Sequence, residues 1–224
     1  MKFFTALHQR FCLPARQLRR NIKTRAHFLT GKLLDFGCGA KPYKEFFTNA
    51  AEYVGLDYEN PGHLHKNESI DVFYNGKEIP FPSGHFDSIL ATQVLEHVED
   101  LPFTLKEWHR VLKQGGRLLI TAPFTWEEHE LPHDYRRFTA IGLEQLLVKN
   151  GFHCVEIKKL GTPIEVISQM EINYISSGVK SRFMRIVLEV FFIIPYSAYV
   201  IVLSRLLPKS EKLYFDTLVL AEKL

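Results

Sequence analysis

Residues 33–42 read L-L-D-F-G-C-G-A-K-P, and this stretch decides the fold. The apolar run before the glycines has the length and the bounding breakers of a buried central strand in a parallel sheet. Gly37 and Gly39 lack the Cβ atoms that would keep a ligand away from the backbone. Pro42 suits the first position of a helix, so we expect a helix over about 42–49 whose free N–H groups point at a ligand above the turn.

Strand and helix signals alternate along the rest of the chain. This alternation predicts an α/β fold with a parallel sheet covered by helices on both faces. The expected strands lie at about 32–36, 53–57, 69–74, 88–91, 117–121, 153–159 and 214–221. The expected helices after the glycine turn lie at about 100–112 and from 139 to about 150, where Asn150-Gly151 is a typical helix end.

Length and cysteine content indicate a single intracellular-type domain. The chain has 224 residues, enough for one domain with a full core and an insertion. Its three cysteines, at positions 12, 38 and 154, are too far apart for a disulfide framework or a zinc motif. This usage favours a reducing compartment, and the start of the chain has no pattern of a signal peptide.

The net charge of +3 hides an asymmetry along the chain. Residues 1–34 carry eight Lys or Arg and no acid, which leaves 20 basic and 25 acidic residues in the remainder. We therefore predict a basic helical arm at 1–30. Such an arm suits contact with phosphate, anionic lipid or nucleic acid. The alternative is a solvated helix that covers the ligand site.

Four stretches resemble, in order and spacing, the class I S-adenosylmethionine-dependent methyltransferases. They are D-F-G-C-G-A-K-P-Y at 35–43, Y-V-G-L-D at 53–57, I-P-F-P-S-G-H-F-D-S-I-L with Q-V-L-E-H-V at 79–98, and E-W-H-R-V-L-K-Q-G-G-R-L at 107–118. The resemblance covers about 31–160 and the last strand. It implies a Rossmann-like seven-stranded sheet of order 3-2-1-4-5-7-6 with strand seven antiparallel. It also implies S-adenosyl-L-methionine over the carboxyl ends of strands one to four.

The resemblance implies cofactor contacts at the ends of these strands. The residues concerned are Asp35, Phe36, Gly37, Cys38, Gly39, Lys41, Asp57, Tyr58, Asn75, Gly76, Gln93 and Val94. Asp57 ends a strand about 20 residues after the glycine turn, which suits an acid that binds ribose hydroxyls. Lys41 is either a surface lysine or an ammonium beside the cofactor's carboxylate. Asn75 stands where many relatives have Asp, and its amide oxygen can still accept a hydrogen bond from adenine.

The loop after the fifth strand, residues 123–139, combines histidines with acidic and aromatic residues. His129 and His133 are candidate general bases, because the ordinary pKa of imidazole lies near neutrality. Asp134 could orient one of them. Together with Glu130 the two histidines resemble metal ligands, but no fourth residue has suitable spacing, so we expect no metal. His97, in L-E-H-V, is either a structural hydrogen-bonding residue or a group that touches the cofactor or accepts a proton.

The same loop offers substrate contacts. Its pattern H-x-x-x-H-D-Y-x-R-x-T resembles methyltransferases encoded with glycan and cell-envelope pathways, and Tyr135 and Arg137 are the candidate substrate-binding residues. The structural alternative is an i,i+3 ion pair between Asp134 and Arg137, with Thr139 capping the next helix.

An apolar insertion at 161–211 separates the last two strands, so the predicted methyltransferase domain consists of 31–160 and 212–224. Residues 186–203 approach a membrane span in length and hydropathy. A simple crossing is excluded if both flanking strands belong to one sheet. One reading is a pair of short helices, broken at Pro195, that dips into a membrane surface. Basic residues flank it: Lys180, Arg182, Arg185, Arg205 and Lys209. The other reading is a soluble apolar cover for substrate binding or dimerisation.

Together these patterns predict an enzyme that methylates a small-molecule, lipid-linked or glycan-linked acceptor in the cytoplasm, peripheral at the membrane. One alternative is a catalytically silent protein of the same fold that acts as a membrane-associated partner. A nucleic-acid methyltransferase is disfavoured, because the body of the chain is acidic and no N-P-P-Y-type tetrad follows strand four. The sequence does not indicate an oligomeric state.

Overall fold

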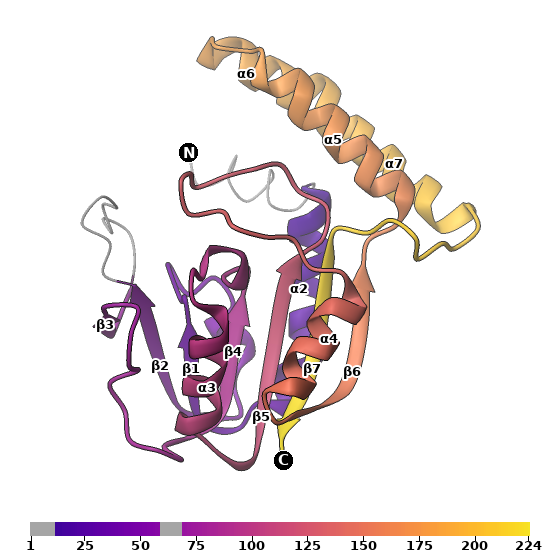
Figure 1. Ribbon diagram of the computed structural model, residues 1–224. Helices are drawn as coiled ribbons and strands as arrows, with labels where there is room; N and C mark the ends of the chain where they lie inside the picture. Colours follow the sequence, from indigo (N-terminus) through magenta and orange to yellow (C-terminus); the bar gives the residue numbers. More distant parts are fainter. Residues whose placement is uncertain (1–11, 59–68) are drawn as a thin grey trace. The chain divides into compact units, whose positions relative to one another are not determined.

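The computed structural model describes residues 12–58 and 69–224, so the predicted start of the basic arm lies outside the described residues. Within them, seven strands form one sheet (Figure 1). The strands are β1 (Gly31–Phe36), β2 (Ala50–Tyr58), β3 (Val72–Tyr74), β4 (Phe86–Thr92), β5 (Leu112–Pro123), β6 (Phe152–Leu160) and β7 (Asp216–Lys223).

The strand order is β3-β2-β1-β4-β5-β7-β6, which confirms the predicted fold. The five strands from β3 to β5 pair in parallel, and Leu33 at the centre of β1 lies between Tyr53 of β2 and Ser88 of β4. The β7 strand runs opposite to β6 (Figure 1), because Phe215 N–H donates to the Leu160 carbonyl while nine residues later the pairing has moved back to Gly151. Because the strands from β3 to β5 are parallel, their carboxyl ends all lie on the same side of the sheet, where ligands bind in such folds.

The chain divides into two compact units. Among the described residues, one unit holds the sheet and consists of 21–58, 69–158 and 217–224, and the other consists of 12–20 and 159–216. The sheet unit contains the 3-10 turns η1 (Ala26–Phe28), η2 (Lys44–Phe46) and η3 (Leu95–His97) and the helices α3 (Leu101–Val111) and α4 (Ala140–Lys149). The other unit contains α5 (Pro163–Ser177), α6 (Arg182–Leu188), the π-helix η4 (Glu189–Ile193) and α7 (Ile194–Leu206). The helix α2 (Leu13–Arg25) begins in this second unit and ends in the sheet unit.

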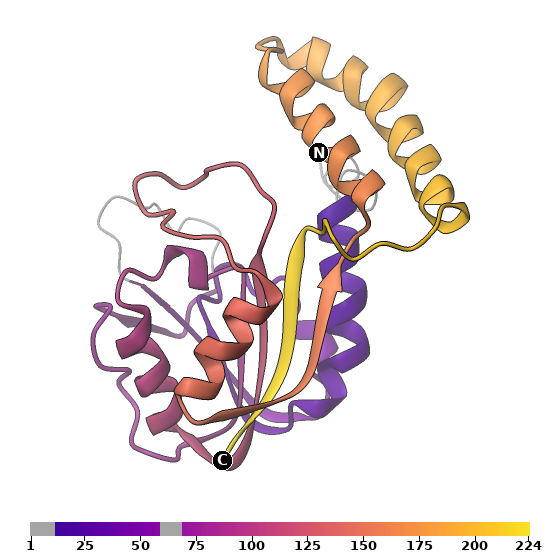
Figure 2. The same ribbon diagram turned by 45° about the vertical axis from the view of Figure 1, so that its right-hand side comes forward.

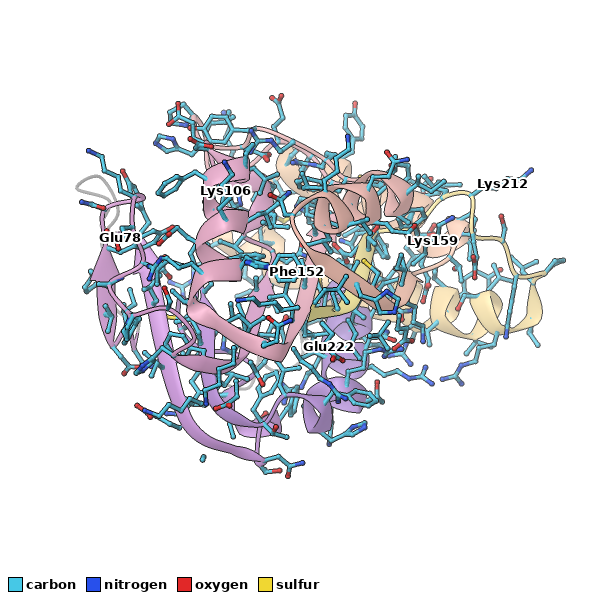
Figure 3. The ribbon with its side chains drawn as sticks, turned by 60° about the horizontal axis from the view of Figure 1, so that its bottom comes forward. Glu78, Lys106, Phe152, Lys159, Lys212 and Glu222 are labelled. Atoms are coloured by element: carbon cyan, nitrogen blue, oxygen red, sulfur yellow. The ribbon has the colours of Figure 1, made fainter. Side chains whose placement is uncertain are left out.

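Helices cover both faces of the sheet. α3 and α4 lie on one face and the last turn of α2 on the other (Figure 2). Trp108 of α3 is fully buried and meets the ring of Phe36 edge to face, with centroids 5.2 Å apart. Phe152, labelled in Figure 3, is 1% exposed and starts β6 in the same core. Arg25 donates to Glu156 of β6 and fixes the end of α2 to the sheet.

The helix expected over 42–49 is wrong, because the structure has only the single 3-10 turn η2 there. Lys41 lies in the left-handed region with φ of 52°, and β2 already begins at Ala50, so the connection has room for little more than one turn. Phe47 after this turn is buried, and its ring lies 6.1 Å from that of Tyr53. A ligand above the glycine turn is therefore not faced by a helix N-terminus.

The insertion forms a helical hairpin of α5 and the continuous helix from Arg182 to Leu206. Tyr196 O–H donates to Glu171 Oε2 at 2.7 Å and its oxygen accepts from the Ser168 hydroxyl at 3.1 Å, which ties α7 to α5. The predicted break at Pro195 is wrong: the proline lies in the first turn of α7, directly after η4. Proline needs no N–H partner in a first turn, and the wider π-helical turn before it accommodates the ring.

This hairpin exposes a large apolar surface. The helix from Arg182 to Leu206 has 25 residues and a mean hydropathy of 2.3 in its most apolar window, of which 11% is buried. By length and composition it is long enough to cross a membrane. Large apolar side chains exposed on the hairpin include Ile167, Tyr174, Ile175, Phe183, Met184, Ile186, Phe191, Phe192, Tyr199, Val202 and Leu206.

Candidate active site

The glycine turn after β1 is fixed from the side of β2. Gly37 and Cys38 N–H groups both donate to the carbonyl of Leu56, at 2.9 and 3.2 Å. Gly39 N–H donates to Asp57 Oδ2 at 2.7 Å, and Tyr58 N–H donates to the other oxygen of the same carboxylate at 2.8 Å. The backbone of the turn and the carboxylate at the end of the neighbouring strand therefore form one rigid corner.

The two glycines have different reasons to lack a side chain. Gly37 has φ of 68°, and a Cβ there would lie 2.3 Å from Val94 Cγ2. Gly39 has φ of 45°, and a Cβ there would meet no atom within 4 Å. The turn is thus packed from below at Gly37 and open above Gly39, beside the Asp57 carboxylate. This open cradle fits a nucleoside whose ribose hydroxyls donate to the remaining lone pairs of Asp57.

Aromatic rings border the same corner. Tyr58 is 47% exposed, and its ring lies edge to face with Tyr74 at 6.2 Å. A Cβ on Gly76 would lie 2.9 Å from the Tyr58 ring, so the ring rests on this glycine. Asn75 is exposed, and its Oδ1 accepts the N–H of Lys77 at 3.1 Å. An amide oxygen has a second lone pair for a ligand.

Lys41 does not serve as the cofactor-facing ammonium considered from the sequence. Its Nζ binds Asp71 Oδ2 at 2.5 Å, and its side chain is 5% exposed. The side chain of Lys41 passes close to Gly55, where an added Cβ would lie 2.2 Å from Lys41 Cε. The ammonium is therefore held beneath the turn by Asp71, which directly precedes β3.

Asp35 and Cys38 are also buried rather than exposed to a ligand. Burial raises the pKa of Asp35 to about 7, although Tyr53 O–H donates to Asp35 Oδ2 at 2.5 Å and opposes the shift. Burial likewise raises the pKa of Cys38 to about 12, and nearby Asp35 adds to this. These side chains support the turn from below, and both burial and the raised pKa disfavour the thiolate form of Cys38.

Gln93 and Val94 follow β4 but differ in what they do. Gln93 has φ of 53°, unusual for a residue with a side chain, and is held by its N–H on the Thr121 carbonyl at 3.0 Å and by its Nε2 on Thr121 Oγ1 at 3.1 Å. Strained residues of this kind cluster at functional sites. Val94 packs under Gly37.

The loop after β5 is bonded directly to the turn η3. Tyr135 N–H donates to the Glu96 carbonyl at 2.9 Å, and His97 Nδ1 lies 2.9 Å from the His133 carbonyl. Arg136 donates to the carbonyls of Val98 and Glu99. This role of Arg136 cannot be predicted from the sequence, because a single arginine carries no pattern that shows which distant carbonyls it will contact.

Asp134 and Arg137 form the i,i+3 ion pair that the sequence offered as the structural alternative. The Asp134 side chain is fully buried, and Arg137 donates to both of its oxygens at 2.5 and 2.7 Å. This pairing holds the pKa of Asp134 well below its usual range. Arg137 also donates to the carbonyls of Trp126 and Glu127, so it closes the loop on itself, and the predicted substrate contact of Arg137 is not supported. Thr139 caps α4 by accepting the N–H of Gly142.

The two candidate bases differ in their surroundings. His129 Nδ1 lies 3.2 Å from Asp134 Oδ2 and 3.2 Å from the Glu127 carbonyl, so Asp134 does orient one histidine of the loop. His133 is exposed, and its Nδ1 lies 3.0 Å from the hydroxyl of Tyr135. Tyr135 is 40% exposed and remains accessible to a substrate.

Known proteins resemble this chain in sequence and in architecture. Residues 34–120 match the model of a methyltransferase domain family. A ubiquinone biosynthesis O-methyltransferase from Bradyrhizobium sp. (strain ORS 278) is 32% identical over 67% of this chain and 60% of its own length. A ubiquinone/menaquinone biosynthesis C-methyltransferase from Shewanella sp. (strain ANA-3) is 42% identical over 25% of this chain and 22% of its own length. The chain thus spans less than two thirds of these curated relatives.

Solved structures agree on the fold. A Burkholderia thailandensis 1,6-didemethyltoxoflavin-N1-methyltransferase with bound S-adenosylhomocysteine superposes with a TM-score of 0.56 at 17% identity, over 92% of this chain and 77% of that one. The [4+2]-cyclase SpnF superposes with a TM-score of 0.59 at 20% identity, over 93% and 80%. At such identities the likeness concerns architecture, and the reaction must be argued from the site.

The buried Asp35 predicts a pH dependence of stability. Its folded-state pKa of about 7 lies above that of an unfolded aspartate, so its contribution to stability is complete below about pH 4 and is lost as the pH rises through 7. Between pH 5 and 8 the free energy of unfolding of the native chain should fall by about 2 kcal/mol relative to Asp35→Asn, measured by urea denaturation.

Asp87→Asn is the matched control. Lys113 holds the pKa of Asp87 below its usual range, so Asp87 keeps its charge between pH 5 and 8, and the free energy of unfolding of its variant should change with pH as that of the native chain does. A difference between Asp35→Asn and the native chain that stays constant over this range would contradict the assignment.

Proposed function

We propose that this chain, which carries a class I S-adenosylmethionine-dependent methyltransferase domain, transfers a methyl group to a small-molecule or lipid-linked acceptor. The observation that carries the proposal is the open cradle above Gly39 beside the carboxylate of Asp57. The match of residues 34–120 to methyltransferase domains supports it independently.

The residues around the turn would hold S-adenosyl-L-methionine. Asp57 accepts hydrogen bonds from ribose hydroxyls, Tyr58 forms an apolar wall for adenine, and Asn75 accepts from the adenine amino group. Gln93, at the end of β4, borders the methyl end. When bound, the cofactor would supply a methyl group bonded to a positively charged sulfonium sulfur, which leaves readily as a neutral thioether. The chain's own task is then to align the acceptor, exclude water and accept a proton.

His133 is the proposed general base. It lies on the exposed side of the loop, whereas His129 Nδ1 faces the buried Asp134. When His133 Nδ1–H donates to the hydroxyl oxygen of Tyr135, 3.0 Å away, the ring is fixed in the tautomer whose Nε2 is free to accept a proton from the acceptor. Tyr135 is the proposed substrate contact.

The names of the relatives favour an oxygen or carbon acceptor. One relative is named an O-methyltransferase and another a C-methyltransferase, and both names refer to quinone biosynthesis. We extend the proposal to an acceptor that presents a hydroxyl group, either as a small molecule or attached to a lipid, because the O-methyltransferase matches 67% of this chain and the C-methyltransferase 25%.

The hairpin supports a peripheral membrane location for a cytoplasmic enzyme. Its unit carries ten Lys or Arg and five acids among residues 12–20 and 159–216, and two of those acids, Glu165 and Asp216, are buried. Exposed apolar side chains together with an excess of basic ones suit the surface of an anionic bilayer. Both ends of the hairpin return to neighbouring strands, which favours entry and exit on one side of the membrane.

Asp57 decides cofactor binding. Asp57→Ala removes the ribose acceptor and should weaken S-adenosyl-L-methionine binding at least about 10- to 100-fold, measured by calorimetric titration. Asp57→Asn keeps an oxygen for Gly39 N–H and should bind with intermediate affinity. An affinity of Asp57→Ala equal to that of the native chain, with both proteins folded by circular dichroism, would overturn the assignment.

His133 decides turnover. Incubation with methyl-labelled cofactor and fractionated cell extract should first identify the acceptor. His133→Gln should then lower kcat by about 10²- to 10⁴-fold through loss of the base, while calorimetry gives an unchanged cofactor affinity. Full activity of His133→Gln would remove this residue from the mechanism.

The hairpin should bind anionic vesicles. The native chain is expected to sediment with vesicles of phosphatidylcholine and phosphatidylglycerol more than with phosphatidylcholine alone. Replacing both Phe191 and Phe192 with Glu should abolish sedimentation, because both side chains are exposed and apolar. Ile141→Glu is the control, because Ile141 is exposed on the outer face of α4 in the sheet unit, and this variant should sediment as the native chain does. A native chain that stays in the supernatant with both vesicles would contradict membrane contact.

A further inference from the structure

Three potential metal ligands from two distant segments meet beside the candidate active site. Glu96 and His97 belong to the turn η3 after β4, and His129 belongs to the loop after β5. One ligand atom from each of the three lies within 4.8 Å of the other two. The hydrogen bonds between Tyr135 and Glu96 and between His97 and the His133 carbonyl hold the two segments together.

Both imidazole rings have the hydrogen bonding typical of metal ligands. A metal-binding histidine usually donates its other ring N–H to a carbonyl or carboxylate, which fixes the tautomer and orients the ring. His97 Nδ1 lies 2.9 Å from the His133 carbonyl, so His97 Nε2 is left to accept. His129 Nδ1 faces Asp134 Oδ2 and the Glu127 carbonyl, both at 3.2 Å, so His129 Nε2 is likewise left to accept.

The carboxylate of Glu96 completes the set. Its side chain is fully buried, where a negative charge has a large desolvation cost unless positive groups offset it. His97 Nε2 lies 3.8 Å from Glu96 Oε1. A second carboxylate is close, because Glu130 Oε2 lies 3.9 Å from the same His97 nitrogen, and Glu130 is exposed on the solvent side. Glu96 also attracts the positive charge of Arg137 electrostatically, but the Arg137 guanidinium is hydrogen-bonded to both oxygens of Asp134.

We propose that Glu96, His97 and His129 form a binding site for a divalent transition-metal ion of the zinc class. Two imidazoles and one carboxylate suit such ions, whereas magnesium and calcium prefer oxygen ligands alone. Metal–ligand distances of about 2.0–2.2 Å place ligand atoms of one ion about 3–3.5 Å apart, so the three side chains close by about 1 Å around the ion. Positions beyond the three protein ligands remain for Glu130 or for an oxygen of a substrate.

This site narrows the acceptor, and that consequence rests on the proposed function. A metal ion of this class binds a hydroxyl oxygen and lowers its pKa. The acceptor O–H bond then loses its proton to His133, the oxygen forms a bond to the methyl carbon, and the bond from sulfur to that carbon breaks with its electron pair on sulfur. No oxidant or reductant takes part. The site therefore selects acceptors with a hydroxyl oxygen.

Metal titration of the full chain tests the site without any methyl transfer. Protein freed of metal by a chelator is titrated with ZnCl₂ in a calorimeter and with CoCl₂ in a visible spectrometer. We expect one ion per chain and the visible absorption of Co²⁺ bound by nitrogen and oxygen ligands. His129→Ala should weaken binding more than about 100-fold, since replacing even an outer partner of a ligating histidine typically costs 10- to 100-fold.

His153→Ala is the matched control, because His153 is an exposed histidine of β6 in the same unit, and it should bind the metal as the native chain does. Glu96→Gln should also lose binding. If it fails to fold by circular dichroism, His129→Ala, a loop variant, decides the result. Absence of a bound ion in the native chain, or affinity retained in His129→Ala, would overturn the site.

The outcome separates this site from the proposed function. A chain that binds S-adenosyl-L-methionine and methylates an acceptor in the presence of a chelator, without binding Zn²⁺ or Co²⁺, removes the metal site and leaves the methyltransferase intact. A chain that binds one ion through His129 but transfers no methyl group removes the methyltransferase and leaves the metal site.

Discussion

The hydrogen bond from Gly39 N–H to the Asp57 carboxylate is the constraint on which the candidate site depends. It joins the first strand's turn to the end of the second strand, and it fixes Gly39, where an added Cβ would meet open space. Everything beneath it serves to hold it in place. Val94 fills the volume under Gly37, while the ion pair of Lys41 with Asp71 occupies the volume beside Gly55. The cradle is therefore set by packing before any ligand arrives.

A second constraint fixes the loop above the sheet. The buried carboxylate of Asp134 receives both the guanidinium of Arg137 and the backbone N–H of His129. A buried carboxylate is tolerated when its oxygens are fully bonded, and the bonds make the loop rigid. Asp134 and Arg137, two candidate functional residues in the sequence, thus have a structural role, and they fix the backbone and the ring of His129. Rigid support of this kind is what a catalytic group requires.

The sequence predicted the sheet well because its signals are local. Short apolar runs mark the strands, and the strand order with an antiparallel last strand is what the resemblance to the methyltransferases implied. The failures came from interactions between distant segments. The Pro42 signal predicted a helix, but β2 begins too soon for one. Pro195 predicted a break, but the π-helical turn before it absorbs the proline. The partner of Lys41, thirty residues away, carries no local signal at all.

The hairpin of α5 to α7 has a consequence for how such chains diversify. It leaves the sheet at the end of β6 and returns at the start of β7, and these strands are antiparallel neighbours. Two adjacent antiparallel strands need only a short turn between them. The hairpin can therefore be lengthened, exchanged or deleted as one segment without changing the register of any strand. Chains built on the same sheet can in this way gain or lose such a hairpin while the residues at the carboxyl ends of the parallel strands keep their places.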